Sequence, residues 1–192
     1  HAELSGWDRL YVADHFMPND DDATGPMLEC WAMVTALAAA VPRIGIGTLV
    51  CGNTYRHPAV LANQAAAADI VSGGRVILGL GAGWQENEHQ KYGIELPPVK
   101  ERMDRFEEAC QIVRSLRDHP RTTFEGRHYR LTDAPMEPKP VGPLPLLVGG
   151  GARAALRGDR ARPPIDPPVD PGAGAPVRRR GAQRSSPRAR HR

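Results

Sequence analysis

The chain has 192 residues, and its 25 Lys and Arg against 22 Asp and Glu give a formal net charge of +3. The positive surplus lies late in the sequence, because residues 1–151 hold 14 basic and 19 acidic residues, whereas residues 152–192 hold 11 Arg and three Asp. The first part is therefore mildly acidic and lacks the basic footprint of a nucleic-acid-binding protein.

Cysteine spacing and hydropathy also bear on whether the protein binds a metal, is secreted or enters a membrane. The chain has three Cys in apolar surroundings, without the paired Cys or Cys/His spacing of a zinc site, so we expect free thiols and no metal. No signal peptide opens the sequence, and no apolar run is long enough to cross a membrane. These features predict a soluble, cytoplasmic protein that does not bind membranes.

The first half of the chain alternates predicted helices and strands. Prolines begin two of the helices, and a Gly-Gly pair ends the second. In chain order the predicted elements are the end of a helix over 1–9, a strand over 10–13, a helix over 27–41, a strand over 44–50, a helix over 59–71 and a strand over 76–80.

The second half begins with the clearest helix, over 98–116. Five apolar residues recur there at steps of three and four, which places them on one helix face. They are Val99, Met103, Phe106, Cys110 and Val113. A small hairpin is predicted over 122–131, and a last core strand over 146–148.

Strands separated by helices and short links indicate a parallel sheet. A (β/α) barrel builds its active site from the turns at the carboxyl ends of such strands, and its full form uses roughly 250 residues. We therefore expect an α/β fold, a partial TIM (β/α)8 barrel with about four parallel strands over residues 1–151. Residues 152–192 contain too few large apolar residues to form a core, which predicts a disordered tail.

Two turns carry the strongest chemical signals. His15 follows a strand, where an imidazole can donate a hydrogen bond or move a proton, and Asp14 can either orient it or cap the next turn. The glycines at 79, 81 and 83 do not match the spacing of a dinucleotide-binding fingerprint. They allow the backbone to approach a flat ligand, or they form a tight turn that binds nothing.

Two further segments have two interpretations each. The helix that follows Arg56 and His57 can present its N-terminus to an anion, or these residues only initiate the helix. Glu88 and His89 either belong to a pocket or begin a surface helix.

Seven segments, in order, resemble the luciferase-like monooxygenase superfamily, and among its branches the coenzyme F420-dependent oxidoreductases. The segments are GWDRLYVADHF, PMLECW, IGIGTLVCGNTYRHPAVLANQ, SGGRVILGLGAGWQENEH, KYGIELPPVKERMDRFEEA, TFEGRHYRL and PKP…PLLVGGG. The resemblance implies a TIM barrel that holds a flavin or deazaflavin at the carboxyl ends of its strands. It also implies a small-molecule substrate and, in the intact family, a homodimer.

The resemblance also assigns roles to residues. It makes His15 the catalytic proton donor or substrate polariser, and it places Trp84 and His89 in the substrate pocket. Sugar-phosphate dehydrogenases of the superfamily carry a catalytic Glu at the position of Trp84, so its absence argues against that activity. A bulge, often with a non-proline cis peptide, is implied behind the cofactor ring. The implied cofactor-binding residues are Asp14, Leu49, Val50, Cys51, Gly81, Ala82, Gly83, Gly149 and Gly150.

The sequence departs from the family at both ends. Compared with the family, we expect the first barrel strand to be missing from this sequence. After Gly151 we expect an Arg- and Pro-rich stretch in place of a helix and three strands, and its composition is the one that a shifted reading frame would give. The function expected from the resemblance is hydride transfer between coenzyme F420 and an unknown organic substrate. The alternatives are an FMN-dependent monooxygenase on the same barrel and an inactive truncated fragment that binds cofactor weakly.

Overall fold

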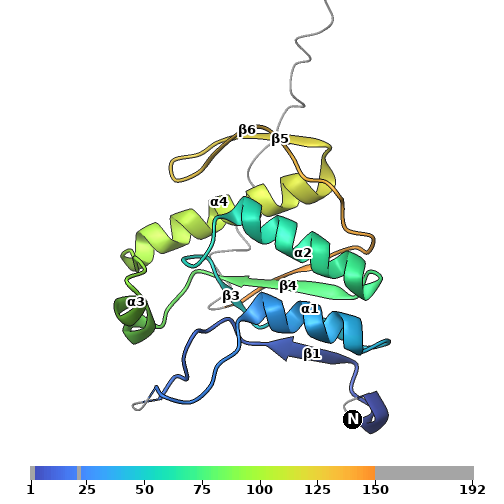
Figure 1. Ribbon diagram of the computed structural model, residues 1–192. Helices are drawn as coiled ribbons and strands as arrows, with labels where there is room; N and C mark the ends of the chain where they lie inside the picture. Colours follow the sequence, from blue (N-terminus) through green and yellow to red (C-terminus); the bar gives the residue numbers. More distant parts are fainter. Residues whose placement is uncertain (1–2, 21–22, 150–192) are drawn as a thin grey trace, which may run out of the picture. The chain divides into compact units, whose positions relative to one another are not determined.

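The computed structural model describes residues 3–20 and 23–149, so the predicted tail over 152–192 lies outside the described residues. Within them, five short strands form one parallel sheet (Figure 1). The strands are β1 (Arg9–Val12), β2 (Gly45–Thr48), β3 (Cys51–Gly52), β4 (Val76–Gly81) and β7 (Leu146–Val148). β1 pairs with β2, while β2 and β3 both pair with β4. β7 lies along the other edge of β4, because Leu80 is paired with both Cys51 and Val148.

The predicted parallel α/β sheet is thereby confirmed, with one interruption. The strand predicted over 44–50 ends at Thr48, and the Leu49–Val50 peptide bond that follows is cis, as the resemblance implied. Across the interruption, the Thr48 hydroxyl donates to the Gly79 carbonyl at 2.8 Å and accepts from the Gly79 N–H at 2.9 Å. This side chain therefore bonds to β4 where the chain leaves the regular ladder.

In the described part of the chain, four α-helices accompany the sheet: α1 (Cys30–Ala40), α2 (Pro58–Ser72), α3 (Glu86–Tyr92) and α4 (Val99–Asp118). Helices α1 and α2 pack on each other, and α2 also packs on α4 (Figure 1). The helix predicted over 27–41 begins only at Cys30, because the Glu29 carboxylate caps it by accepting the Ala32 N–H at 2.7 Å. Helix α2 ends at Gly73, whose φ of 71° suits a glycine. Near the N-terminus the structure has a short 3-10 turn over Glu3–Ser5 in place of a longer helix end.

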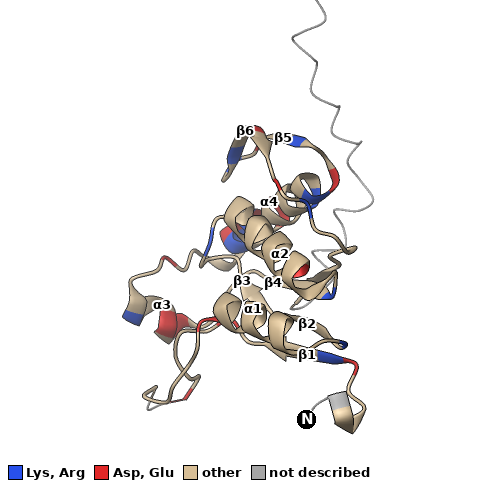
Figure 2. Cartoon of the chain, turned by 45° about the vertical axis from the view of Figure 1, so that its right-hand side comes forward, with Lys and Arg blue, Asp and Glu red and all other residues tan. Residues whose placement is uncertain are grey.

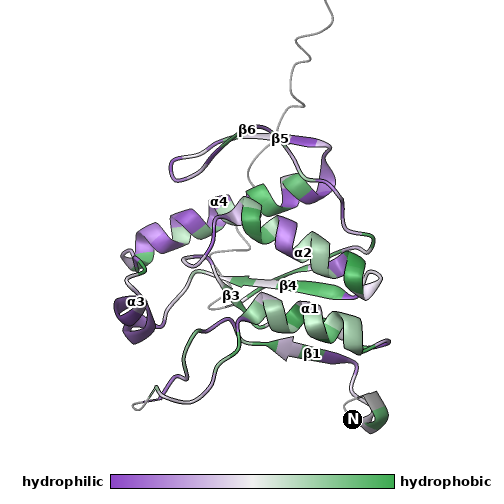
Figure 3. Cartoon of the chain, viewed as in Figure 1, coloured by the Kyte–Doolittle hydropathy of each residue, from purple (hydrophilic) through white to green (hydrophobic). Residues whose placement is uncertain are grey.

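Helix α4 buries a face that differs slightly from the predicted one. Phe106, Ile112 and Leu116, further along the helix, are buried, whereas Val99 in the first turn is 66% exposed. Figure 3 shows the same change along the helix, from hydrophilic at its start to hydrophobic near its end. None of the described helices is both long and apolar enough to span a membrane.

The predicted hairpin is present as antiparallel strands β5 (Arg121–Glu125) and β6 (Arg130–Pro135). The Glu108 carboxylate of α4 holds its turn by accepting the N–H groups of residues 127, 128 and 129 at 2.8 to 3.1 Å. In Figure 2 acidic and basic segments are interspersed along the elements, and basic residues do not gather on one element.

Candidate active site

A cavity of about 520 Å³ lies at the carboxyl ends of the strands. The carboxyl end of β4 and the turns that follow β1, β2 and β7 meet there, and they contribute Gly81, Asp14, Val50 and Gly149, as predicted. The complete described lining consists of Asp14, His15, Leu49, Val50, Cys51, Gly52, Tyr55, Gly81, Ala82, Gly83, Trp84, Met103, Phe106, Val148 and Gly149. Most of these groups are apolar side chains or backbone, which suits a flat organic ligand.

Two glycines of this lining are required by close packing against Val50. A Cβ atom at Gly149 would lie 2.6 Å from the Val50 Cγ2 atom, and one at Gly81 would lie 2.9 Å from the same atom. Any larger residue at either position would displace Val50. The glycines therefore leave room for the Val50 side chain and keep the adjacent wall of the cavity as bare backbone.

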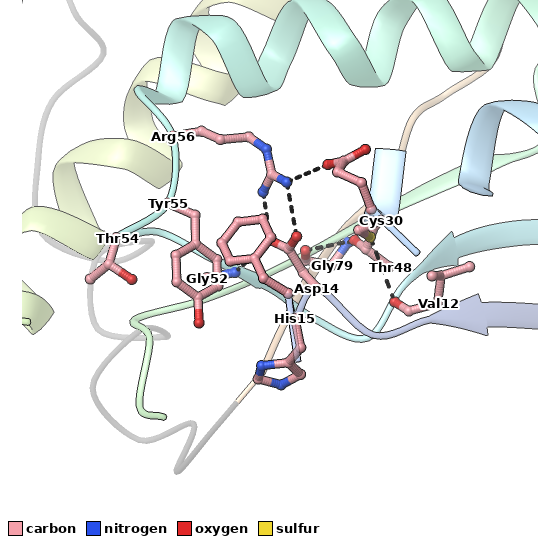
Figure 4. Close-up of polar contacts among 12 residues, drawn as sticks. Val12, Asp14, His15, Cys30, Thr48, Gly52, Thr54, Tyr55, Arg56 and Gly79 are labelled. Carbon is pink, nitrogen blue, oxygen red and sulfur yellow. Dashed lines mark hydrogen bonds and ion pairs between the residues drawn. The ribbon is translucent and has the colours of Figure 1, made fainter. Parts of the chain in front are cut away.

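Asp14 is held in an ion pair beside the cavity (Figure 4). Its carboxylate accepts from Arg56 Nη1 at 2.6 Å and from Arg56 Nη2 at 2.9 Å, and it also accepts the Gly52 N–H at 3.1 Å. The side chains of Asp14 and Arg56 are only 1% and 11% exposed. Burial alone would lower the pKa of Arg56, but the contact with Asp14 outweighs it and raises the pKa above its usual value. Asp14 thus fixes the turn after β1 to the turn after β3.

His15 is oriented by Glu88 and not by Asp14. Its Nδ1 atom lies 2.9 Å from Glu88 Oε2, and Figure 4 shows its ring pointing away from the Asp14–Arg56 pair. The ring lies edge-on to Trp84, with centroids 5.8 Å apart. The His15 side chain is 19% exposed and lines the cavity, so a ligand can reach it.

Ten of the twelve predicted site residues line the cavity. Gly150 lies outside the described residues. His89 is a correction, because it is buried and absent from the lining: its Nε2 atom lies 2.7 Å from Thr54 Oγ1, and its ring stacks on Tyr55 at 4.9 Å. It supports the cavity wall from behind.

Three polar residues at or beside the cavity are absent from the predicted site residues: Tyr55, Arg56 and Glu88, of which Glu88 was left open as a pocket residue. The sequence interpretation of Arg56 concerned the start of α2, with or without a bound anion; in the structure Arg56 pairs with Asp14, and His57 caps α2 by accepting the Ala59 N–H at 3.2 Å. The anion-binding interpretation of this helix start gains no support from these contacts. For Glu88, the sequence offers one indication of a role in the site: it lies in a polar segment that directly follows the turn after β4.

A parallel sheet flanked by helices, with a cavity at the carboxyl ends of its strands, is the arrangement in which (β/α) barrels bind their ligands. The fold and the site therefore define the chain as part of a TIM-barrel protein. The particular family follows from the sequence, since the family model described as luciferase-like monooxygenase matches residues 1–159. The chain belongs to the luciferase-like monooxygenase family.

Known proteins similar to this chain include F420-dependent enzymes. The F420-dependent glucose-6-phosphate dehydrogenase of Amycolatopsis mediterranei is 37% identical over 152 residues, which cover 78% of this chain and 45% of that protein. The structure of an F420-dependent secondary alcohol dehydrogenase in complex with an F420-acetone adduct is 32% identical, with a TM-score of 0.71 over 78% of this chain and 45% of the other. Monooxygenase RslO1 from Streptomyces bottropensis shares the fold, at 24% identity and a TM-score of 0.65 over 77% of this chain and 44% of that one. The chain thus spans about half the length of these relatives.

Proposed function

We propose that the cavity binds coenzyme F420 and that the protein transfers a hydride between this deazaflavin and a small, uncharged alcohol or carbonyl substrate. One observation carries the proposal: a wall of backbone and apolar groups adjoins His15, the one imidazole in the described lining. The F420 dependence of the dehydrogenase and of the alcohol dehydrogenase structure that resemble this chain supports it.

The described residues fit a flat tricyclic ring. The backbone of Gly81, Ala82 and Gly83 would lie along the ring, because no large side chain projects from this stretch. Leu49, Val50 and Cys51 would form the surface behind it, and Gly149 would border it beside Val50. Asp14 would support the cofactor site indirectly, because its carboxylate accepts the Gly52 N–H and so holds the turn at the edge of the site.

Bound F420 would accept or supply the hydride, so that a substrate alcohol loses a hydride from carbon and a proton from oxygen and becomes a carbonyl. His15 would take up this proton in oxidation and return it in reduction. Trp84, 60% exposed at the rim, would form one wall of the substrate pocket. The resemblance places Trp84 where sugar-phosphate dehydrogenases carry a catalytic Glu, and the similar alcohol dehydrogenase structure contains an F420-acetone adduct, so both support an uncharged substrate over a sugar phosphate.

The test combines binding and turnover. F420 fluorescence during titration with the protein should report tighter binding than a parallel titration with FMN. With F420, a secondary alcohol such as 2-propanol should reduce the cofactor, and glucose 6-phosphate should not.

The role of His15 is tested by substitution. His15→Gln should keep F420 binding and lose turnover at least ~100-fold, whereas His119→Gln, at an exposed position, should bind F420 and turn over substrate like the parent. Tighter FMN binding would contradict the cofactor, and turnover of glucose 6-phosphate would contradict the substrate class.

A further inference from the structure

The carboxylate of Glu88 collects four hydrogen bonds in the interior. Its Oε1 atom accepts the N–H groups of Phe16 at 2.5 Å and Met17 at 3.2 Å, while Oε2 accepts the Tyr55 hydroxyl and faces His15 Nδ1 at 2.9 Å. The Glu88 side chain is fully buried. Burial alone would raise the pKa of Glu88, but the hydrogen bonds from Tyr55, His15 and Phe16 outweigh it and lower the pKa below its usual value. Glu88 is therefore ionised at neutral pH.

An ionised carboxylate can only accept hydrogen bonds. The His15 nitrogen that faces Glu88 must therefore carry a proton, and in the neutral ring this leaves the lone pair on Nε2. No hydrogen bond within the described part of the chain involves Nε2, and His15 lines the cavity. Nε2 is the ring atom left for a ligand.

We propose that Glu88 is the positioning residue that fixes His15 in the tautomer with Nδ1 protonated and Nε2 presented to the cavity. The inference rests on the proposed function in one respect: it makes Nε2 the atom that exchanges a proton with the substrate oxygen. Glu88 orients His15, whereas Asp14, the neighbour of His15 in sequence, does not. The carboxylate of Asp14 instead binds Arg56 and the Gly52 N–H and so holds the adjacent turn.

Glu88 also has a structural role that the test must separate from this one. It ties the turn after β1 to α3 through the N–H groups of Phe16 and Met17, and the Tyr92 hydroxyl donates to the Phe16 carbonyl at 3.1 Å beside it. A residue that only anchors the turn would affect stability but would leave the choice of ring tautomer unchanged. The tautomer is therefore the decisive readout.

The experiment uses the 192-residue chain labelled with ring-15N histidine, studied by long-range 1H–15N NMR at about pH 8.5, roughly two pH units above the pKa of a free imidazole. His15→Gln identifies the His15 resonances. Glu88→Gln removes the negative charge at nearly constant shape. Glu86→Gln makes the same substitution at an exposed position in the same helix. Tyr55→Phe removes one donor to Glu88 but keeps its charge.

In the parent protein the Nδ1-protonated tautomer of His15 should dominate. Glu88→Gln should lower its ratio to the Nε2-protonated form about tenfold, because a charge-assisted hydrogen bond is roughly twice as strong as a neutral one. Glu86→Gln and Tyr55→Phe should leave the parent tautomer dominant. An unchanged ratio in Glu88→Gln would overturn the proposal. If that variant does not fold, a parent protein dominated by the Nε2-protonated form would overturn it equally.

A second readout keeps this inference apart from the proposed function. In F420-dependent turnover, Glu88→Gln should lower kcat while the dissociation constant for F420 stays within about twofold. Absence of turnover in the parent would count against the proposed function alone, because the NMR measurement needs no cofactor. A loss of kcat with the parent tautomer retained would count against the positioning role.

Discussion

Replacing Arg56 with Ala should destabilise the protein strongly, because it leaves the Asp14 carboxylate buried and almost without partners. Arg56 donates two hydrogen bonds to this carboxylate, and only the Gly52 N–H would remain among its described contacts. Breaking a buried ion pair by removing one partner costs about 3–5 kcal/mol. The second contact of Arg56, with the more exposed Glu29, adds at most about 1 kcal/mol. We expect a loss of about 4 kcal/mol, a large part of the stability of a typical domain.

Urea unfolding at pH 7, followed by circular dichroism, measures this loss. Arg105→Ala is the matched control: its partners are Glu101 and Glu95 on the surface, so it should cost less than about 1 kcal/mol. The double variant Asp14→Asn/Arg56→Ala should be more stable than Arg56→Ala alone, since it removes the unpaired charge. A loss below about 1 kcal/mol for Arg56→Ala, or a double variant no more stable than the single one, would refute this reasoning.

Three further predictions concern the packing and titration of the same sheet end. Gly79→Ala should cost at least about 2 kcal/mol in urea unfolding, because its Cβ atom would lie 2.1 Å from the Thr48 carbonyl oxygen; wild-type stability would contradict the packing. The folded-state pKa of Glu88 lies below its ordinary value of 4.5, so its contribution is complete above that pH and is lost as the pH falls through the folded-state pKa. Acid titration should therefore show a steeper loss of stability for the parent than for Glu88→Gln, and parallel curves would argue against it. Contact with Cys51 and burial raise the pKa of Cys30, so this thiol should react with Ellman's reagent far more slowly in native protein than in urea, and equal rates would contradict this.

The sequence predicted the sheet and the position of the cavity well, for a physical reason. Apolar runs and Pro or Gly boundaries are local signals, and the carboxyl ends of parallel strands necessarily meet at one edge of the sheet. Ten cavity residues could thus be found from strand ends and the family resemblance. The interruption at Leu49 and Val50 was anticipated from the resemblance, whereas periodicity alone predicted a continuous strand over 44–50.

The missed features depend on contacts between distant residues. Helix α3, with the sequence ENEHQKY, has no apolar periodicity, and its buried side chains are the polar Glu88 and His89. Their burial becomes favourable only through partners such as His15, 73 residues away, and Thr54. The pairing of Asp14 with Arg56 is likewise invisible in one sequence. His89 was placed in the pocket because proximity along the chain to Trp84 does not show on which side of the wall a helical residue lies.

The double hydrogen bond of Thr48 limits which amino acids this position can accept. One hydroxyl satisfies both the N–H and the carbonyl of Gly79, in a place that solvent does not reach. Valine has nearly the same shape but would leave two backbone groups of β4 without partners, whereas serine would keep both bonds. At Ile46 in the same strand, any aliphatic residue of similar volume would pack. Two neighbouring buried positions thus differ sharply in their tolerance: one is defined by volume, and the other allows only a hydroxyl-bearing side chain.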